Sequence, residues 1–420
     1  MHQLYTLGSD YLRPRYIESA EPLLPTNWTR SGLYVRSTDY QRTLQSVTSL
    51  LQGLYPPGTG PTLWDAPAQP AVTPDRIQVV PIHTEPQTED GLLTWSGPTC
   101  PTWATQRNAY LNEQEAATGE EGIFKTLLDK LATATDFPGL NLNNLYKVLD
   151  GLLTDTFHGH PLPGKLDAAD VAQAVNASQW VMAQWYGTPE FRKLGGGYMV
   201  SLVRDRMFAR ANNSAQPEFD PSTYPSPTWE QLTGPRLAVY SSHDITLLTL
   251  LYALGLESGP AENPPYASSI VFELVELDSA AHLRAAGPDM TKFAVRIFYN
   301  KGIGTKGSSG ENTTKPFDAK NVVQIPGCKN QGTGGDILCR LDDFMQLTDA
   351  VNEPNWQEPC GLVAPAAAGS TKGSAGPTKL LEVGVGGAFG GLVLGVAITY
   401  FLTRPKQGTD GAAAGPYNHL

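Results

Sequence analysis

Short apolar runs that end in polar corners predict two units of strand and helix. Residues 237–240 are apolar and too few for a helix, so they predict a buried strand that a Ser-Ser pair ends. The run behind Asp244 carries no further charge up to Gly255, which closes the predicted helix as a C′ glycine. His243 and Asp244 therefore lie at the carboxyl end of a strand, on the opening turn of a buried helix.

The second unit carries an arginine near its tip. Residues 33–39 predict another short strand with Arg36 near its end, and apolar residues then recur at helical spacing until a Pro-Pro pair stops them. One sheet could bring these tips together, where open α/β sheets bind ligands and helix N-termini favour anions. Arg36 would clamp a phosphate, His243 would add a second cation or donor, and Asp244 would protonate a leaving oxygen. The plainer alternative is that Asp244 only caps the helix and that His243 is structural.

These units and several further stretches resemble the histidine acid phosphatases, most closely their membrane-bound, lysosomal and prostatic branch. The matching stretches occur in family order from Met1 to about Cys360. They are MHQLYTLGSDYLRPRY at the start, YVRSTDYQRTLQS with GLYPP behind it, VVPIHT at 79–84, GPTCP around Cys100, VYSSHDITLL, PPYASS at 264–269 and IPGC at 325–328.

The resemblance implies both a fold and a site. The fold is an α/β, phosphoglycerate-mutase-like doubly wound sheet with an inserted α-helical cap. Arg36 matches a phosphate-binding arginine, His243 a phosphate-binding histidine of the catalytic site, and Asp244 the acid that protonates the leaving group. Neither a cofactor nor a metal is expected.

The family signature R-H-G-x-R-x-P, which supplies the attacking histidine, is missing from the chain. No arginine in the sequence is followed by histidine. We expect the signature to lie on a first strand before residue 1, so that the chain holds the clamp and the acid without the nucleophile. Five other histidines lack the Arg-His-Gly context and are expected at surface or loop positions: His2, His83, His158, His160 and His282.

The pattern becomes mainly helical between about residue 97 and residue 230. Helices are predicted at 122–131, 140–153, 168–185 and 195–211. We interpret 97–230 as a helical cap inserted into a core made of 1–96 and 231–360. Strands are predicted at 270–277 and 293–299. Three aromatic residues could line the cleft beside such a cap, although core packing is their more frequent role: Trp180, Trp185 and Tyr186.

Cysteines and glycosylation sequons indicate the secretory pathway. The four cysteines permit three pairings, free buried thiols are the alternative, and no Cys/His cluster suggests zinc. The family resemblance implies that Cys100 pairs with Cys360 and Cys328 with Cys339. Sequons, each a weak signal alone, occur at Asn27, Asn176, Asn212 and Asn312. Residues 1–16 lack the basic and apolar regions of a signal peptide.

The C-terminal region predicts a membrane anchor. Residues 361–382 are an Ala/Gly/Ser/Pro spacer, and 383–402 are free of charge and long enough for a transmembrane helix. Gly387, Gly391 and Gly395 would let two such helices approach closely, and Arg404 and Lys406 follow the span. A buried soluble helix is the alternative. The tail 403–420 ends in Tyr-Asn-His-Leu, which resembles an endocytic sorting signal.

The charge balance of the chain argues against one class of partner. A formal net charge of −11 without basic runs argues against nucleic acid as a partner. We expect a phosphate monoester substrate and a membrane contact, and we leave a homodimer open. The leading hypothesis is a single-pass acid phosphatase that acts through a phosphohistidine, with its domain in the lysosomal or endosomal lumen or at the cell surface. The alternatives are an inactive phosphate-binding or regulatory membrane protein of the same fold and a structural membrane protein without a ligand.

Overall fold

Seven described strands form one mixed sheet in which neighbouring strands are often far apart in the sequence. A computed structural model describes residues 1–63, 70–94, 99–118, 120–212, 235–257, 261–277, 290–302, 315–329, 337–362 and 395–401. The strands are β1 (Leu33–Ser37), β2 (Leu237–Ser242), β3 (Ser268–Glu276), β4 (Phe293–Asn300), β5 (Val322–Val323), β6 (Cys339–Arg340) and β7 (Gly395–Phe401). Their order is β1-β2-β7-β3-β4-β5, and β6 pairs with β4.

Both faces of the sheet are buried, which explains why its strands read as continuous apolar runs. Leu33, Val35, Leu237 and Val239 face one hydrophobic cluster together with the N-terminal helices. The alternate positions, including Tyr34 and Tyr240, face a larger cluster with the remaining helices. Arg36 follows Tyr34 by two residues and therefore points to the second face.

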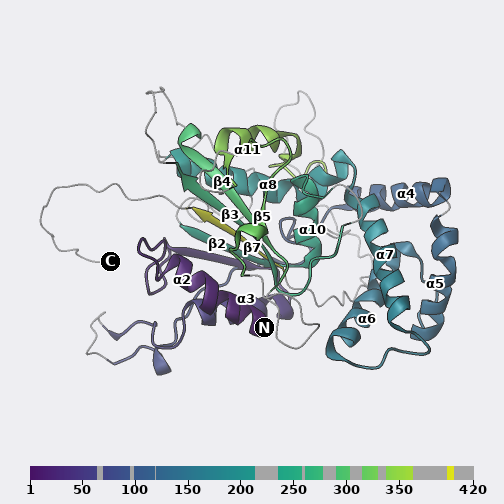
Figure 1. The fold of residues 1–420 in the computed structure, drawn as a ribbon, viewed down its shortest axis with the longest axis horizontal. Helices are drawn as coiled ribbons and strands as arrows, with labels where there is room; N and C mark the ends of the chain where they lie inside the picture. Colours follow the sequence, from purple (N-terminus) through teal and green to yellow (C-terminus); the bar gives the residue numbers. More distant parts are fainter. Residues whose placement is uncertain are drawn as a thin grey trace, which may run out of the picture.

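Helices cover the two faces unequally (Figure 1). The helices of the first face are α1 (His2–Thr6), the π-helical turn η1 (Leu7–Leu12), α2 (Arg13–Tyr16) and α3 (Gln41–Leu54). The others are α4 (Pro101–Thr118), α5 (Glu120–Thr135), α6 (Tyr146–His158), α7 (Ala168–Tyr186), α8 (Pro189–Asn212), α10 (Asp244–Ala253) and α11 (Leu341–Leu347). All four predicted helices between residues 97 and 230 have a counterpart here, whereas α4 was not predicted as a separate helix. The limits of the cap itself stay a prediction.

The helix α10 lies at the centre of the second face and packs against α8. A Cβ atom at Gly196 of α8 would lie 2.6 Å from the Thr249 carbonyl oxygen of α10, so only glycine permits this approach. Gly255 ends α10 with a positive φ of 69°, as its predicted C′ position requires. The close contact fixes the axis of α10, and with it the position of its first turn at the tip of β2.

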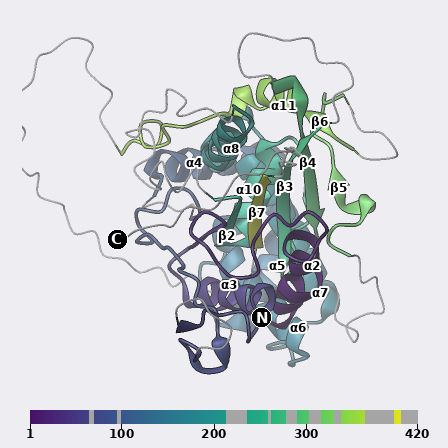
Figure 2. The same cartoon turned by 90° about the vertical axis from the view of Figure 1, so that its left-hand side faces the viewer.

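The prediction of a helix over 383–402 is wrong for residues 395–401, which form β7. This strand lies between β2 and β3 in Figures 1 and 2, antiparallel to β2 and parallel to β3. The backbone pairing explains the difference, because β2 and β3 are joined through β7 and each offers it a row of donors and acceptors. Residues 383–394 of the predicted span lie outside the described residues. Among the helices that the structure describes, none has the length and apolarity to cross a membrane.

Two disulfides join the same cysteines that the family resemblance pairs. Cys100, just before α4, is bonded to Cys360, 260 residues later in the sequence. Cys328 is bonded to Cys339, which lies at the start of β6 and 11 residues later in the sequence. The long link ties the helical part of the chain to the segment that follows α11.

We expect Ile398→Pro to lower the melting temperature by several degrees. Ile398 pairs with Val239 of β2 and Val271 of β3, and a proline in a central strand removes a ladder hydrogen bond. Circular dichroism measures the transition, and Ile398→Val, which keeps the N–H, is the control. Equal melting temperatures for the proline and valine variants would contradict the pairing of β7.

Candidate active site

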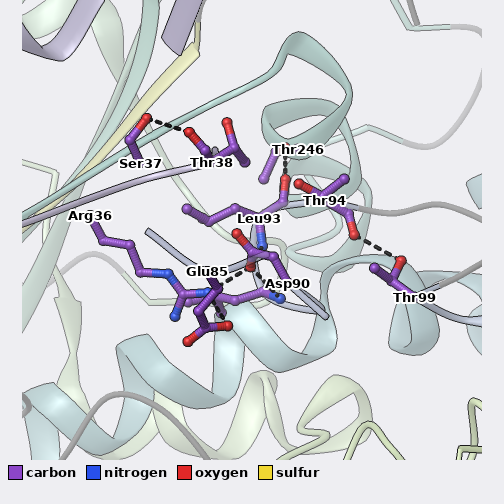
Figure 3. Close-up of polar contacts among 10 residues, drawn as sticks. Arg36, Ser37, Thr38, Glu85, Asp90, Leu93, Thr94, Thr99 and Thr246 are labelled. Atoms are coloured by element: carbon purple, nitrogen blue, oxygen red, sulfur yellow. Dashed lines mark hydrogen bonds and ion pairs between the residues drawn. The ribbon is translucent and has the colours of Figure 1, made fainter. Parts of the chain in front are cut away.

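Arg36 lies near the carboxyl end of β1 and is almost completely buried, with 1% of its surface exposed. Its Nη2 atom donates to Asp90 Oδ1 at 2.6 Å and to Glu85 Oε2 at 2.8 Å, as Figure 3 shows. Burial lowers the pKa of Arg36, but the two carboxylates raise it by more, so the net pKa lies above its ordinary value. Nε and Nη1 have no hydrogen-bond partner among the described residues. The guanidinium is therefore a cation that is fixed through Nη2 and still has N–H donors on Nε and Nη1 for a further acceptor.

His243 is the N-cap residue of α10 and is held neutral. Its Nδ1 lies 3.4 Å from Arg42 Nη2, and the ring of Tyr40 meets the imidazole edge to face at 5.1 Å. Because arginine can only donate, Nδ1 accepts and the ring proton lies on Nε2, which has no partner in the described part of the chain. Burial, followed by the charge of Arg42, lowers the pKa of His243 to about 3. Of the two predicted roles, the site favours a neutral donor over a second cation.

Asp244 is the first residue of α10 and has the opposite shift. Burial raises its pKa to about 6, and the negative charge of Asp150 on α6 adds to the rise. The backbone N–H of Ile245 and the charge of Arg42 oppose it. Below pH 6 the carboxyl is therefore mainly protonated and can donate, which is the state that a general acid requires.

The strands bring these three residues to one edge of the sheet. β1 and β2 are parallel neighbours, with Arg36 in register with Tyr240 and the Thr38 N–H bonded to the Ser241 carbonyl oxygen at 3.0 Å. Unpartnered buried donors of this edge include Arg36 Nε and Nη1, Arg42 Nε, Ser242 Oγ and His243 Nε2. Buried donors without partners are costly, so their gathering indicates a site built for an anion with several acceptor oxygens.

Four site residues escaped the sequence analysis because they come from distant segments or lack a motif. Arg42 could have been found, since it lies on the first turn of the helix that follows the β1 tip. Glu85 and Asp90 come from an irregular loop, and Asp150 comes from α6. A carboxylate in such segments gives no periodic signal, so sequence patterns cannot select it.

Two of the other candidates lie beside the site, because the backbone of His83 forms a bridge with Arg36 and Tyr186 interacts electrostatically with Asp244. His2 lies at the start of α1, His83 is exposed and stacks on Tyr34 at 5.0 Å, and His158 and His160 stack on each other at the end of α6, exposed. Trp185 and Tyr186 are buried in the core, and Trp180 is partly buried against it. The acceptor asparagines Asn27 and Asn176 are exposed. His282, Asn312 and the side chain of Asn212 lie outside the description.

The described residues contain no group of three or more His, Cys, Asp or Glu side chains that could hold a metal ion. The candidate site combines the strongly held Arg36, the neutral His243 and Asp244, a carboxyl that stays protonated in mild acid. Such a set can bind a tetrahedral oxyanion and give a proton to an oxygen that leaves it.

Comparison with known proteins finds relatives that align with most of the chain. The chain is 29% identical over 367 residues to human lysosomal acid phosphatase, an alignment that covers 87% of this chain and 71% of that protein. It is 27% identical over 365 residues to mouse prostatic acid phosphatase, covering 86% and 78% of the two chains. Among solved structures, the phytase of Klebsiella sp. ASR1 is similar over 87% of this chain and 85% of its own, with 14% identity and a TM-score of 0.47.

The chain also matches the sequence model of a whole family. The sequence model described as histidine phosphatase superfamily (branch 2) matches residues 1–300, which include Arg36, His243 and Asp244. Since this match spans most of the chain, the protein belongs to branch 2 of the histidine phosphatase superfamily.

Proposed function

We propose that the protein is an acid phosphatase that binds the phosphate group of a monoester at Arg36 and His243. The observation that carries this proposal is the set of buried, unpartnered donors of these two residues beside a carboxyl whose pKa is about 6. Arg36 supplies the positive charge, and neutral His243 supplies a hydrogen bond from Nε2. Asp244 protonates the leaving oxygen. The relatives named acid phosphatases support the same reaction class.

Attack on phosphorus is the step for which the described residues offer no histidine. We propose that the enzyme uses a phosphohistidine, formed by a histidine of an R-H-G-x-R-x-P signature that the 420 residues do not contain. Binding of phosphate by this chain without turnover on any phosphate monoester would favour the alternative, a phosphate-binding or regulatory protein of the same fold.

The disulfides and the relatives support a proposal for the compartment. Stable disulfides occur mainly in oxidising compartments, and the human relative is named lysosomal. We propose that the domain resides in the lysosomal or endosomal lumen or at the cell surface.

The first expectation concerns the arginine clamp. Arg36→Lys keeps the charge beside Asp90 but removes the spare Nε and Nη1 donors, so inorganic phosphate should bind roughly tenfold or more weakly, the scale of a lost hydrogen bond to a charged group. Isothermal titration calorimetry measures the dissociation constant. Arg340→Lys is the matched control, because Arg340 pairs with Asp342 at the start of α11. Equal binding by wild type and Arg36→Lys would contradict the proposed clamp.

The second expectation concerns Asp244 and the pH. Its pKa in the folded protein is about 6 against an ordinary 3.8, so in a protein that also contains the R-H-G-x-R-x-P signature, turnover of alkyl phosphates should fall as the pH rises through 6. The same shift stabilises the fold fully below pH 3.8, and this contribution is lost as the pH rises through 6. Asp150→Asn removes a negative neighbour and should lower the pKa of Asp244, as measured by carbon NMR of labelled carboxyl groups. An unchanged titration in Asp150→Asn would refute the role of Asp150, and Asp244→Asn identifies the signal.

The third expectation concerns the membrane. A membrane span over residues 383–402, which their length and lack of charge would allow, and the strand β7 over 395–401 exclude each other. Because β7 pairs with β2 and β3, alkaline extraction of expressing cells should release the full chain from the membrane pellet. Retention of the full chain in the pellet would contradict the pairing of β7 and favour the anchor.

A further inference from the structure

The loop of residues 85–94, here called the strap, contacts the arginine through a carboxylate that is fixed to its own backbone. Asp90 is fully buried, and its Oδ1 accepts from Arg36 Nη2 at 2.6 Å. The same oxygen accepts from the N–H of Leu93 at 3.0 Å (Figure 3). It also accepts from the N–H of Leu92 at 3.2 Å. Because three donors converge on one oxygen, the carboxylate cannot rotate away, and one nitrogen of the guanidinium is fixed with it.

The other end of the strap contacts the helix that carries His243 and Asp244. Thr246 Oγ1 donates to the Leu93 carbonyl oxygen at 2.8 Å and accepts from the His243 N–H at 3.4 Å. Leu93 is thus bonded on both sides of its backbone, to Asp90 through its N–H and to Thr246 through its carbonyl. A continuous chain of hydrogen bonds runs from Arg36 on β1 to His243 at the N-cap of α10.

Glu85 contacts the same arginine nitrogen but differs in its anchoring. Its Oε2 lies 2.8 Å from Arg36 Nη2, and 23% of its side chain is exposed. Among the described residues, no second donor meets this carboxylate, and Oε1 has no partner. Glu85 therefore adds negative charge beside the anion site without fixing the geometry.

We infer that Asp90 and Thr246 are positioning residues, which act through the strap to set the distance between the Arg36 guanidinium and the His243 imidazole that together receive phosphate. The inference rests on the proposed function of this site. A positioning role and a purely electrostatic role predict opposite changes in phosphate affinity when Asp90 is neutralised, because the carboxylate of Asp90 repels a bound phosphate. If Asp90 acted only through its charge, its neutralisation would strengthen phosphate binding. If it positions Arg36, its neutralisation weakens binding despite the lost repulsion.

The test compares two neutralised carboxylates on one arginine. We expect Asp90→Asn to bind inorganic phosphate roughly tenfold more weakly than wild type, the scale of one lost hydrogen bond to a charged group. Glu85→Gln removes the same charge from an unanchored and partly exposed side chain, so binding should tighten by roughly two- to fivefold. Burial raises the pKa of Asp90, while the charge of Arg36 opposes the rise. Calorimetry at pH 7, where both carboxylates are more fully ionised than in acid, gives both dissociation constants. Tighter binding by Asp90→Asn, or equal weakening in the two variants, would overturn the inference.

Substitutions at Thr246 test the far end of the strap without touching the ion pair. Thr246→Val removes the hydroxyl and should weaken phosphate binding severalfold. Thr246→Ser keeps the hydroxyl and should bind phosphate as wild type does. Melting temperatures show whether each variant is folded. If Asp90→Asn does not fold, the comparison of Thr246→Val with Thr246→Ser tests the inference instead. Binding by Thr246→Val equal to wild type would overturn the coupling. A wild-type protein that does not bind phosphate would instead contradict the proposed function and, with it, this inference.

Discussion

The buried ion pair between Arg36 and Asp90 is the interaction on which the site depends. A guanidinium removed from water is costly unless carboxylates and hydrogen bonds compensate, and removal of either partner leaves a charge stranded in a poorly solvated place. Here the compensation is only partial, because both carboxylates accept from Nη2 while the N–H groups of Nε and Nη1 have no acceptor among the described residues. The protein thus retains a cation in its interior that an incoming anion can complete.

Burial has opposite effects on the pKa values of His243 and Asp244, which lie at the same edge of the sheet. The same low-dielectric surroundings disfavour the charged forms of His243 and Asp244, so one loses its proton and the other keeps it. Adjacent residues consequently present a neutral imidazole and a neutral carboxyl, both able to donate a hydrogen bond. The burial of the two side chains, more than their residue types, sets which one is the neutral hydrogen-bond donor and which one is the proton donor.

The periodicity of the sequence predicted the elements that carry the site, since α3 and α10 begin where apolar spacing and polar corners indicated. It also placed Arg36 and the His243–Asp244 pair at strand ends, which parallel pairing of β1 and β2 brings together. It did not predict the strap or Asp150, because contacts between an irregular loop, a distant helix and a strand tip leave no local pattern. The strand β7 was missed for a related reason. An uncharged apolar run can form either a membrane-spanning helix or a central strand, and only the backbone pairing with β2 and β3 distinguishes the two.

The link between Cys100 and Cys360 has a consequence for a protein exposed to proteases. Most of the described chain lies between these two cysteines, so a single backbone cut anywhere in that interval leaves the pieces joined by a covalent bond. The strap and β1 precede Cys100, whereas α10 lies inside the interval, and the sheet and the strap hold the two parts together. A nicked molecule would therefore migrate as one species until a reductant separates it, and the proposed phosphate site would outlast the intact polypeptide.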